Sequence, residues 1–190
     1  MKIKIEVSGR HIHLSEKDLE KLFGKGYQLK KLKNLSQEGE FAAREEVTVC
    51  GKRATFQGVR VVGPCRKETQ LEISATDARH LGVDAPVKLS GSLKGTPGIR
   101  IEGPKGKLAL KKGVIIAQRH LHVNPEEAKK LNLKKGSLVA IRVSGGRGLL
   151  FENVAVRIAD NYKLDLHIDT DEANAAGVDE RNCYGELVRE

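Results

Sequence analysis

The sequence RHIHLSEKDLEKL at residues 10–22 returns as RHLHVNPEEAKKL at residues 119–131. Each copy joins an Arg-His-x-His tetrapeptide to a segment with the apolar spacing of a short helix. Four of the six histidines of the chain lie in these two tetrapeptides. Because they fall at matching points of a repeat, the pattern indicates two copies of one structural unit with a shared chemical role.

A second pair of segments extends the repeat. The segment VRVVGPCRKETQLEISATDARHLGVD (59–84) aligns without a gap with VAVRIADNYKLDLHIDTDEANAAGVD (154–179), at a constant offset of 95 residues. The tetrapeptides are 109 residues apart, so the first half carries 14 additional residues, which we place within 24–43. We expect two domains, 1–92 and 93–190, that meet in the Gly- and Pro-containing stretch SGSLKGTPG.

Short strands dominate the expected structure of both domains. Val-rich segments that alternate apolar and polar residues, such as GVRVVG (58–63) and NVAVRI (153–158), predict strands separated by Gly turns. The fold class is therefore mainly β with short helices: two similar β-barrel domains, each capped by short α-helices and related by internal duplication. The pattern also allows strands to be exchanged between the two domains.

The helix and turn signals fit this architecture. Ser15 and Asn124 are suited to cap the helices that follow the tetrapeptides, and Pro125 suits a first helical position. The Gly-rich segments GPKGK (103–107) and SGGRG (144–148) do not match a phosphate-binding P-loop and predict hairpin turns instead. Each domain is expected to end with a second short helix.

Composition places the chain among packed cytoplasmic proteins. Of its 190 residues, 39% are hydrophobic and only 4% aromatic, so aliphatic side chains must build the core. No apolar run approaches the roughly 20 residues that span a bilayer, and the N-terminal MKIKIEVSG predicts a strand, not a signal peptide. Three cysteines without a CxxC pair indicate a reducing compartment.

The paired histidines predict a metal site. In a strand, residues i and i+2 point to the same side about 6.6 Å apart, so the two histidines of each tetrapeptide can converge on one ion. A single HxH is more often an ordinary surface pair, but two copies at equivalent positions favour metal binding, and imidazole suits zinc. Glu72 aligns with His167, and both are potential ligands. The candidate metal ligands are His11, His13, Glu72, His120, His122 and His167.

One arginine interrupts the symmetry of the repeat. Arg66 aligns with Asn161 and lies six residues before Glu72, on the same side of an extended segment. A guanidinium beside a metal cluster suits phosphate binding, although an ordinary surface arginine explains it equally well. His80 has no counterpart in the other half, and we expect an ordinary helix histidine there.

Other functions fit parts of the pattern. The net charge of +9 suits an anionic partner, but a basic nucleic-acid-binding module would need aromatic residues among its basic ones. Such a module with a structural zinc would also need a closed, Cys-rich site. A cupin-like or hydrolytic HxH metalloenzyme needs further ligands, and the HxHxDH pattern lacks its Asp because Ser15 stands there.

Several segments resemble a known family. VSGRHIHLS (7–15), GPCRKETQLEIS (63–74) and LHIDTDEANAAG (166–177) are similar to the PduL-type phosphate acyltransferases, also called phosphate propanoyltransferases. The resemblance implies two β-barrel domains with capping helices and two zinc ions per chain, or other divalent metals. It implies exchange of a short acyl group, acetyl or propanoyl, between coenzyme A and inorganic phosphate. The expected partners are these small molecules, without nucleic acid or membrane, and a homo-oligomer is compatible.

The resemblance also assigns roles to individual positions. His11 and His13 would hold the zinc that faces the coenzyme A sulfur, while the other zinc would be held by Glu72, His120, His122 and His167. Arg66 would be the catalytic, phosphate-binding arginine. Residues lining the phosphate pocket would be Gln37, Gln70, Ser90 and Arg157. Residues contacting coenzyme A would be Ser8, Lys33, Arg60 and Asn174. Family members in bacterial microcompartments often carry an N-terminal extension, and because a strand is expected from Lys2, we expect a free cytoplasmic enzyme.

Overall fold

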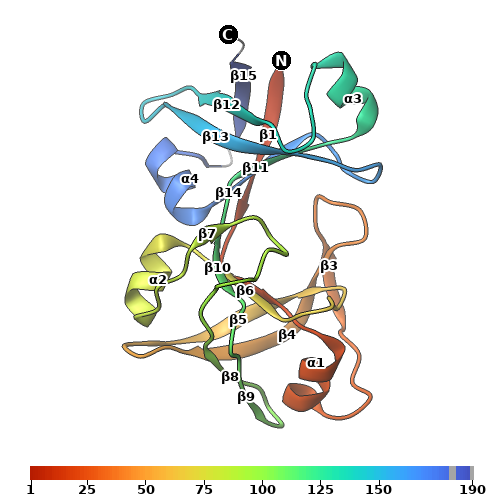
Figure 1. Ribbon diagram of the computed structural model, residues 1–190, viewed down its shortest axis with the longest axis vertical. Coiled ribbons are helices and arrows are strands. Elements are labelled where there is room, and N and C mark those ends of the chain that lie inside the picture. Colours follow the sequence, from red (N-terminus) through yellow and green to blue (C-terminus); the bar gives the residue numbers. More distant parts are fainter. Residues whose placement is uncertain (180–182, 189–190) are drawn as a thin grey trace. The chain divides into compact units, whose positions relative to one another are not determined.

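The structure, a computed structural model, describes residues 1–179 and 183–188. It is mainly β, with short helices, and it divides into two compact units (Figure 1). The barrel unit comprises residues 1–8, 36–38 and 118–190, and the sheet unit comprises residues 9–35 and 39–117. Each unit is described by itself below.

The barrel unit is a closed six-stranded barrel. Its strands, in order around the barrel, are β1 (Lys2–Ser8), β14 (Asp165–Asp169), β11 (His120–Val123), β13 (Leu149–Ile158), β12 (Leu138–Val143) and β15 (Tyr184–Val188). The barrel closes because β15 pairs with both β12 and β1. The helices of this unit are α3 (Pro125–Lys130) and α4 (Thr170–Ala176). Its core is mostly aliphatic, and Ile3, Leu121, Ile141 and Leu166 are fully buried in it.

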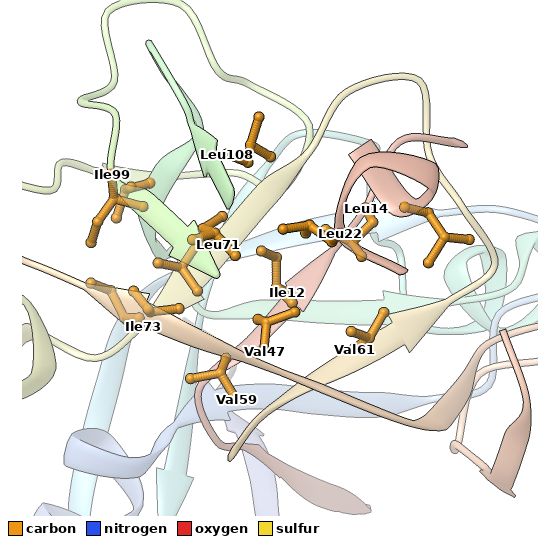
Figure 2. Packing of buried hydrophobic residues seen from close by; sticks show 14 of the residues in the cluster. Ile12, Leu14, Leu22, Val47, Val59, Val61, Leu71, Ile73, Ile99 and Leu108 are labelled. Carbon is orange, nitrogen blue, oxygen red and sulfur yellow. The ribbon is translucent and has the colours of Figure 1, made fainter. Parts of the chain in front are cut away.

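The sheet unit is built around a nine-stranded sheet. Its main order is β7 (Val87–Lys88), β10 (Val114–Ala117), β6 (Gln70–Ile73), β2 (His11–His13), β5 (Thr55–Gly63), β4 (Phe41–Cys50), β8 (Arg100–Glu102) and β9 (Lys107–Ala109), with β3 (Lys31–Asn34) paired to β4. The helices are α1 (Glu16–Phe23) and α2 (Ala75–Leu81). Figure 2 shows part of the core, in which Ile12, Leu71 and Val59 pack together.

Only one of the two expected barrels is closed. In the barrel unit, a single strand pairs with both open edges of the sheet. In the sheet unit, β10 pairs with β7 and β4 pairs with β8. In the described chain, no single strand pairs with both β10 and β4, which closure would require. The sheet therefore stays open, and the expectation of a second closed barrel is wrong.

The compact units also divide the chain differently from the expected halves 1–92 and 93–190. The N-terminal strand β1 lies in the barrel unit, where it pairs in parallel with β14. Strand β10 lies in the sheet unit, where it pairs in parallel with β6. Hence each strand that precedes a tetrapeptide belongs to one unit, while the tetrapeptide itself belongs to the other.

Local signals in the sequence are confirmed by the structure. The Ser15 hydroxyl accepts a hydrogen bond from the Asp18 amide at the start of α1, and the Asn124 side chain accepts one from the Glu127 amide at the start of α3. Residues 103–106 connect the antiparallel strands β8 and β9, and residues 144–148 connect β12 and β13, so both Gly-rich segments form hairpin turns. No described helix has the length and apolar character needed to cross a membrane.

The burial of Ile12 leads to a prediction about the stability of the sheet unit. Its side chain is fully buried between the two histidines of β2, so Ile12→Ala should lower the free energy of unfolding by about 2–5 kcal/mol. Leu32→Ala is the control, since Leu32 is 51% exposed on β3 and should change stability by about 0.5 kcal/mol or less. Chemical denaturation measures both. Equal effects of the two substitutions would contradict the packing described here.

Candidate active site

The sheet unit brings His11, His13 and Glu72 together. The histidines lie on β2, and the antiparallel neighbour β6 places Glu72 directly opposite His11. One potential ligand atom from each residue lies within 4.8 Å of the others. Nε2 of His11 lies 3.8 Å from Glu72 Oε2, and Nε2 of His13 lies 3.7 Å from Glu72 Oε1. This group can hold a metal ion.

Backbone carbonyls orient both rings of this cluster. Nδ1 of His11 lies 2.8 Å from the Gly9 carbonyl oxygen, and Nδ1 of His13 lies 3.1 Å from that of Val62. In a neutral imidazole, an Nδ1–H that donates to a carbonyl leaves the lone pair on Nε2. Nε2 is also the atom that faces Glu72 in each ring. The rings are therefore oriented for a cation.

The charge states of this cluster also suit a cation. Burial, together with the charges of His11 and Arg66, lowers the pKa of His13 to about 3, so its ring is neutral. Burial by itself would raise the pKa of Glu72, but His11 and His13, with help from Ser90 and Arg66, lower it to about 2. Two imidazole nitrogens and one ionised carboxylate form a donor set that zinc commonly binds.

The barrel unit contains a triad of histidines. His120 and His122 lie on β11, and β14 places His167 opposite His120. Their ring centroids are 4.5 to 5.1 Å apart. His120 repeats the arrangement of His11, because its Nδ1 lies 2.9 Å from the Gln118 carbonyl oxygen. This triad is the second group that can hold a metal ion.

His122 gives the strongest structural indication of a ligand. Both of its ring nitrogens are buried and have no hydrogen-bond partner in the described parts of the chain. Burial, followed by the charges of His120, His167 and Arg157, lowers its pKa to about 2. Tyr162 stacks on its ring with a centroid distance of 4.0 Å. A buried neutral imidazole with an unsatisfied nitrogen is stabilised by a bound cation, so the triad fits a metal.

The grouping of Glu72 differs from the expected partition. The resemblance assigned Glu72 to the ion held by His120, His122 and His167, but its carboxylate lies with His11 and His13 because β6 pairs with β2. Each unit thus contains three side chains that could hold an ion. Three protein ligands leave coordination positions for water or substrate, as catalytic zinc sites do.

Three predicted phosphate-binding residues of the sheet unit meet at Glu72. Arg66 Nη1 donates to the Ser90 hydroxyl oxygen at 2.8 Å, and that hydroxyl donates to Glu72 Oε1 at 2.9 Å. The Gln70 amide donates to Glu72 Oε1 at 2.5 Å and to Ser90 Oγ at 2.8 Å. Arg66 Nη1 lies 4.0 Å from Glu72. A cationic side chain and two polar side chains therefore adjoin the metal ligands.

Glu40 is a residue of this site that the sequence analysis missed. Its carboxylate accepts a hydrogen bond from Arg66 Nη2 at 3.2 Å, and its side chain is 37% exposed. It lies in the segment 24–43, which contains the 14 residues that the second half of the repeat lacks, so the two halves do not align there. Comparison of the halves could therefore not identify it.

Gln37 and Arg157 lie beside the histidine triad of the barrel unit. The Gln37 side chain is buried, donates to Asp165 Oδ2 at 3.2 Å and lies 3.5 Å from His167 Nε2. Burial raises the pKa of Asp165. Arg157 on β13 is the register partner of His122. The sequence analysis missed Asp165, although it is on the same face of the LDLHID strand as His167.

The four predicted coenzyme A contacts are divided between the units. Ser8 is the last residue of β1. Asn174 lies on α4, and its side chain lines a surface pocket of the barrel unit together with Ile5 and Val7. Lys33 and Arg60 lie in the sheet unit, on β3 and β5.

Arg60 is fixed by several contacts. Its guanidinium donates to the carbonyl oxygens of Ala43 and Arg44, and it forms an ion pair with Glu46. It is also the parallel register partner of His11.

Comparison with known proteins identifies the family. Residues 4–179 match the sequence model of phosphate propanoyltransferases. The chain belongs to the phosphate propanoyltransferase family. A phosphate propanoyltransferase of Thermotoga maritima is 53% identical over 175 residues, which span 92% of this chain and 83% of the relative. One of Salmonella typhimurium is 48% identical over 187 residues, which span 98% of this chain and 89% of the relative.

Family membership explains the nature of the site. A phosphate propanoyltransferase is a transferase that exchanges an acyl group between coenzyme A and inorganic phosphate. Both substrates are anions, which suits the net charge of +9. The buried triads are the candidate metal centres of this phosphate propanoyltransferase family member.

Metal binding by the two triads can be tested separately. His13→Ala and His122→Ala should each remove about half of the bound zinc, since each variant leaves the other triad intact. Metal content of purified protein and circular dichroism would be measured together. His80→Ala is the control because His80 lies exposed on α2. Full zinc content in either triad variant would contradict the assignment.

In the metal-free protein, the free energy of unfolding should fall as the pH drops from about 6.5 to about 3. The pKa values of His13 and His122 are about 3 and about 2 in the folded chain, below the value of about 6.5 of an unfolded chain. Between these values the unfolded chain binds protons that the folded chain does not, so acid favours unfolding. Denaturation at a series of pH values measures the slope, which His122→Phe should flatten. Stability that rises toward pH 4 would refute neutral buried rings.

Proposed function

We propose that the protein is a zinc-dependent phosphate acyltransferase that transfers short acyl groups, acetyl or propanoyl, between coenzyme A and phosphate. The observation that carries the proposal lies in the sheet unit. There Arg66, Gln70 and Ser90 converge on Glu72, which itself belongs to a triad suited to a metal ion. Groups that bind an anion thus adjoin a group that binds a cation, as transfer to or from phosphate requires.

Zinc fits both triads, and cobalt or iron would find the same nitrogen-rich donor sets acceptable. His11, His13 and Glu72 would hold one ion, and His120, His122 and His167 the other. When bound, zinc lowers the pKa of a thiol and polarises a carbonyl oxygen, and thioester chemistry needs both effects. The protein's own residues supply the remaining requirements.

Arg66 would bind the phosphate and balance its negative charge during transfer. Its present partner, the half-exposed carboxylate of Glu40, occupies a place that an incoming phosphate can take, because both are anions with oxygen acceptors. The Ser90 hydroxyl and the Gln70 amide would complete the binding of the phosphate oxygens. Both side chains are hydrogen-bonded to each other and to Glu72, so they are held in place before substrate arrives.

In the barrel unit, Gln37 and Arg157 would contribute to phosphate binding next to the histidine triad. Asp165 accepts a hydrogen bond from the Gln37 amide and so fixes the direction of that amide. Coenzyme A would contact Ser8 and Asn174 in this unit. In the sheet unit it would contact Lys33 and Arg60, whose positive charges suit its phosphates.

Duplication of one ancestral unit, with exchange of the first strand, would explain the arrangement of both units. His11 has Arg60 as its parallel partner and Glu72 as its antiparallel partner. His120 has Ala155 and His167 in the same roles, at the offsets of 109 and 95 residues found in the sequence. Identical pairing at identical offsets supports the two sequence halves 1–92 and 93–190 as copies.

Residence in the cytoplasm is the localisation that composition favours, because the three cysteines form no CxxC pair. The acyltransferase function is favoured over a cupin-like or hydrolytic metalloenzyme and over a nucleic-acid-binding module, because the chain belongs to the phosphate propanoyltransferase family and has anion-binding groups next to Glu72. A homo-oligomer stays a prediction.

Replacement of Arg66 tests the proposed function. Arg66→Ala should lower kcat by about 100-fold or more, the loss typical of removing one group that stabilises transition-state charge, while zinc content stays normal. The assay mixes coenzyme A with propanoyl phosphate and follows thioester formation with and without a chelator. Arg79→Ala, at an exposed position on α2, is the matched control. Thioester formation that persists at full rate in Arg66→Ala or under the chelator would contradict the proposal.

A further inference from the structure

We propose that the arginine that opens each tetrapeptide, Arg10 or Arg119, is a positioning residue that sets the spacing of the metal ligands in its unit. The inference rests on the proposed metal-dependent function, and it assigns a role to two residues that touch neither triad. Each arginine ties the strand that carries the HxH histidines to the helix that follows the third ligand.

In the sheet unit, Arg10 makes a two-pronged contact with Asp77. Its Nε and Nη2 atoms lie 2.9 and 2.6 Å from the two carboxylate oxygens, and Asp77 is only 3% exposed. The guanidinium also lies over the ring of Phe56, 4.3 Å from its centroid. Paired hydrogen bonds and an aromatic platform hold a guanidinium in one orientation, which a lysine cannot reproduce.

In the barrel unit, Arg119 makes the corresponding contacts. Its Nη1 lies 2.8 Å from Glu172 Oε1, and its Nε donates to the Glu152 carbonyl oxygen at 2.7 Å. The guanidinium lies 5.4 Å from the centroid of the Phe151 ring. The other carboxylate oxygen of Glu172 accepts a hydrogen bond from the Asp169 amide in the capping box of α4. Arg119 is thereby fixed to the first turn of that helix.

The contacts of Arg10 and those of Arg119 involve residues at equivalent positions of the repeat. Arg10 and Arg119 are 109 residues apart, as the histidines are. Their acidic partners, Asp77 and Glu172, and their aromatic platforms, Phe56 and Phe151, are each 95 residues apart. The contacts recur although one unit is a closed barrel and the other an open sheet. The acidic residue differs between the two copies, Asp77 in one and Glu172 in the other, yet the ion pair with the arginine is kept.

The contacts reach the ligands from both sides. On one side, Arg10 separates His11 from Gly9, whose carbonyl orients the His11 ring. On the other side, Asp77 lies in the first turn of α2, which begins directly after the strand that carries Glu72. A fixed Arg10–Asp77 contact therefore limits how far His11 and Glu72 can separate.

The barrel unit has the same connections. Arg119 follows Gln118, whose carbonyl orients His120. Glu172 lies in the first turn of α4, which begins directly after the strand that carries His167. Residues that orient metal ligands from outside the coordination sphere commonly change metal affinity by about 10–100-fold when they are replaced.

The test measures zinc affinity at each triad separately. In a His122→Ala background only the sheet-unit triad remains, and in a His13→Ala background only the barrel-unit triad remains. Competition with a chromophoric chelator gives the zinc affinity, and cobalt(II) absorption reports the ligand geometry. Arg10→Met and Asp77→Asn should each weaken zinc binding at the sheet-unit triad by about 10-fold or more and leave the other triad unchanged. Arg119→Met should do the reverse.

Two further variants separate positioning from stability. Arg10→Lys keeps the charge without the two-pronged contact, so it should fold and bind zinc with intermediate affinity and an altered cobalt spectrum. Arg79→Met, which removes an exposed arginine of α2, is the matched control and should change neither quantity. Variants that lower the free energy of unfolding but keep wild-type zinc affinity and cobalt spectra would overturn the inference. Absence of zinc from the unmodified protein would instead overturn the proposed metal-dependent function itself.

Discussion

Strand register at the HxH segments is the constraint on which both candidate metal centres depend. In a strand, neighbouring side chains point to opposite faces, so a slip of one residue would turn the histidines into the aliphatic core and the intervening residue to the face that now carries the candidate ligands. The fully buried Ile12 and Leu121 exclude such a slip, because each would lose its apolar surroundings. The same register then places Glu72 opposite His11 and His167 opposite His120. Packing of one aliphatic side chain in each unit thus fixes the positions of the three candidate ligands of that unit.

Burial and nearby positive charge give these polar groups a common electrostatic character. The buried rings of His13 and His122 have pKa values lowered mainly by burial, and each also lies near an arginine. Such an imidazole stays neutral and keeps a lone pair available for a cation. The arginines near each triad are suited to anionic substrates, so the proposed cation and anion sites would adjoin without neutralising each other. This combination explains how a strongly basic protein can keep candidate metal ligands in its interior.

Much of the local structure follows from the sequence, because it depends on neighbouring residues. Ser15 and Asn124 cap their helices as capping chemistry predicts, and the Gly-rich segments 103–107 and 144–148 turn where expected. The ligand candidates follow from the repeat. Barrel closure could not be predicted, because it depends on pairings between distant strands. In the barrel unit, the single strand β15 pairs with both open edges and closes the sheet, whereas in the sheet unit two different strands, β7 and β8, pair with the corresponding edges and the sheet stays open. Glu40 and Tyr162 were missed for a related reason: their roles come from tertiary contacts with Arg66 and His122 that no repeat position signals.

The location of β1 has a consequence for how the chain reaches its native state. Lys4 pairs with Asp165, so β1 lies beside a strand that is synthesised much later than β1 itself. Pairings this distant in sequence carry a large loop-closure cost and form slowly. The barrel cannot assemble during synthesis of the first half, and the sheet unit likewise waits for β10. Neither unit is a contiguous stretch of sequence, and cutting the chain between its halves would leave each half without a strand that its sheet requires.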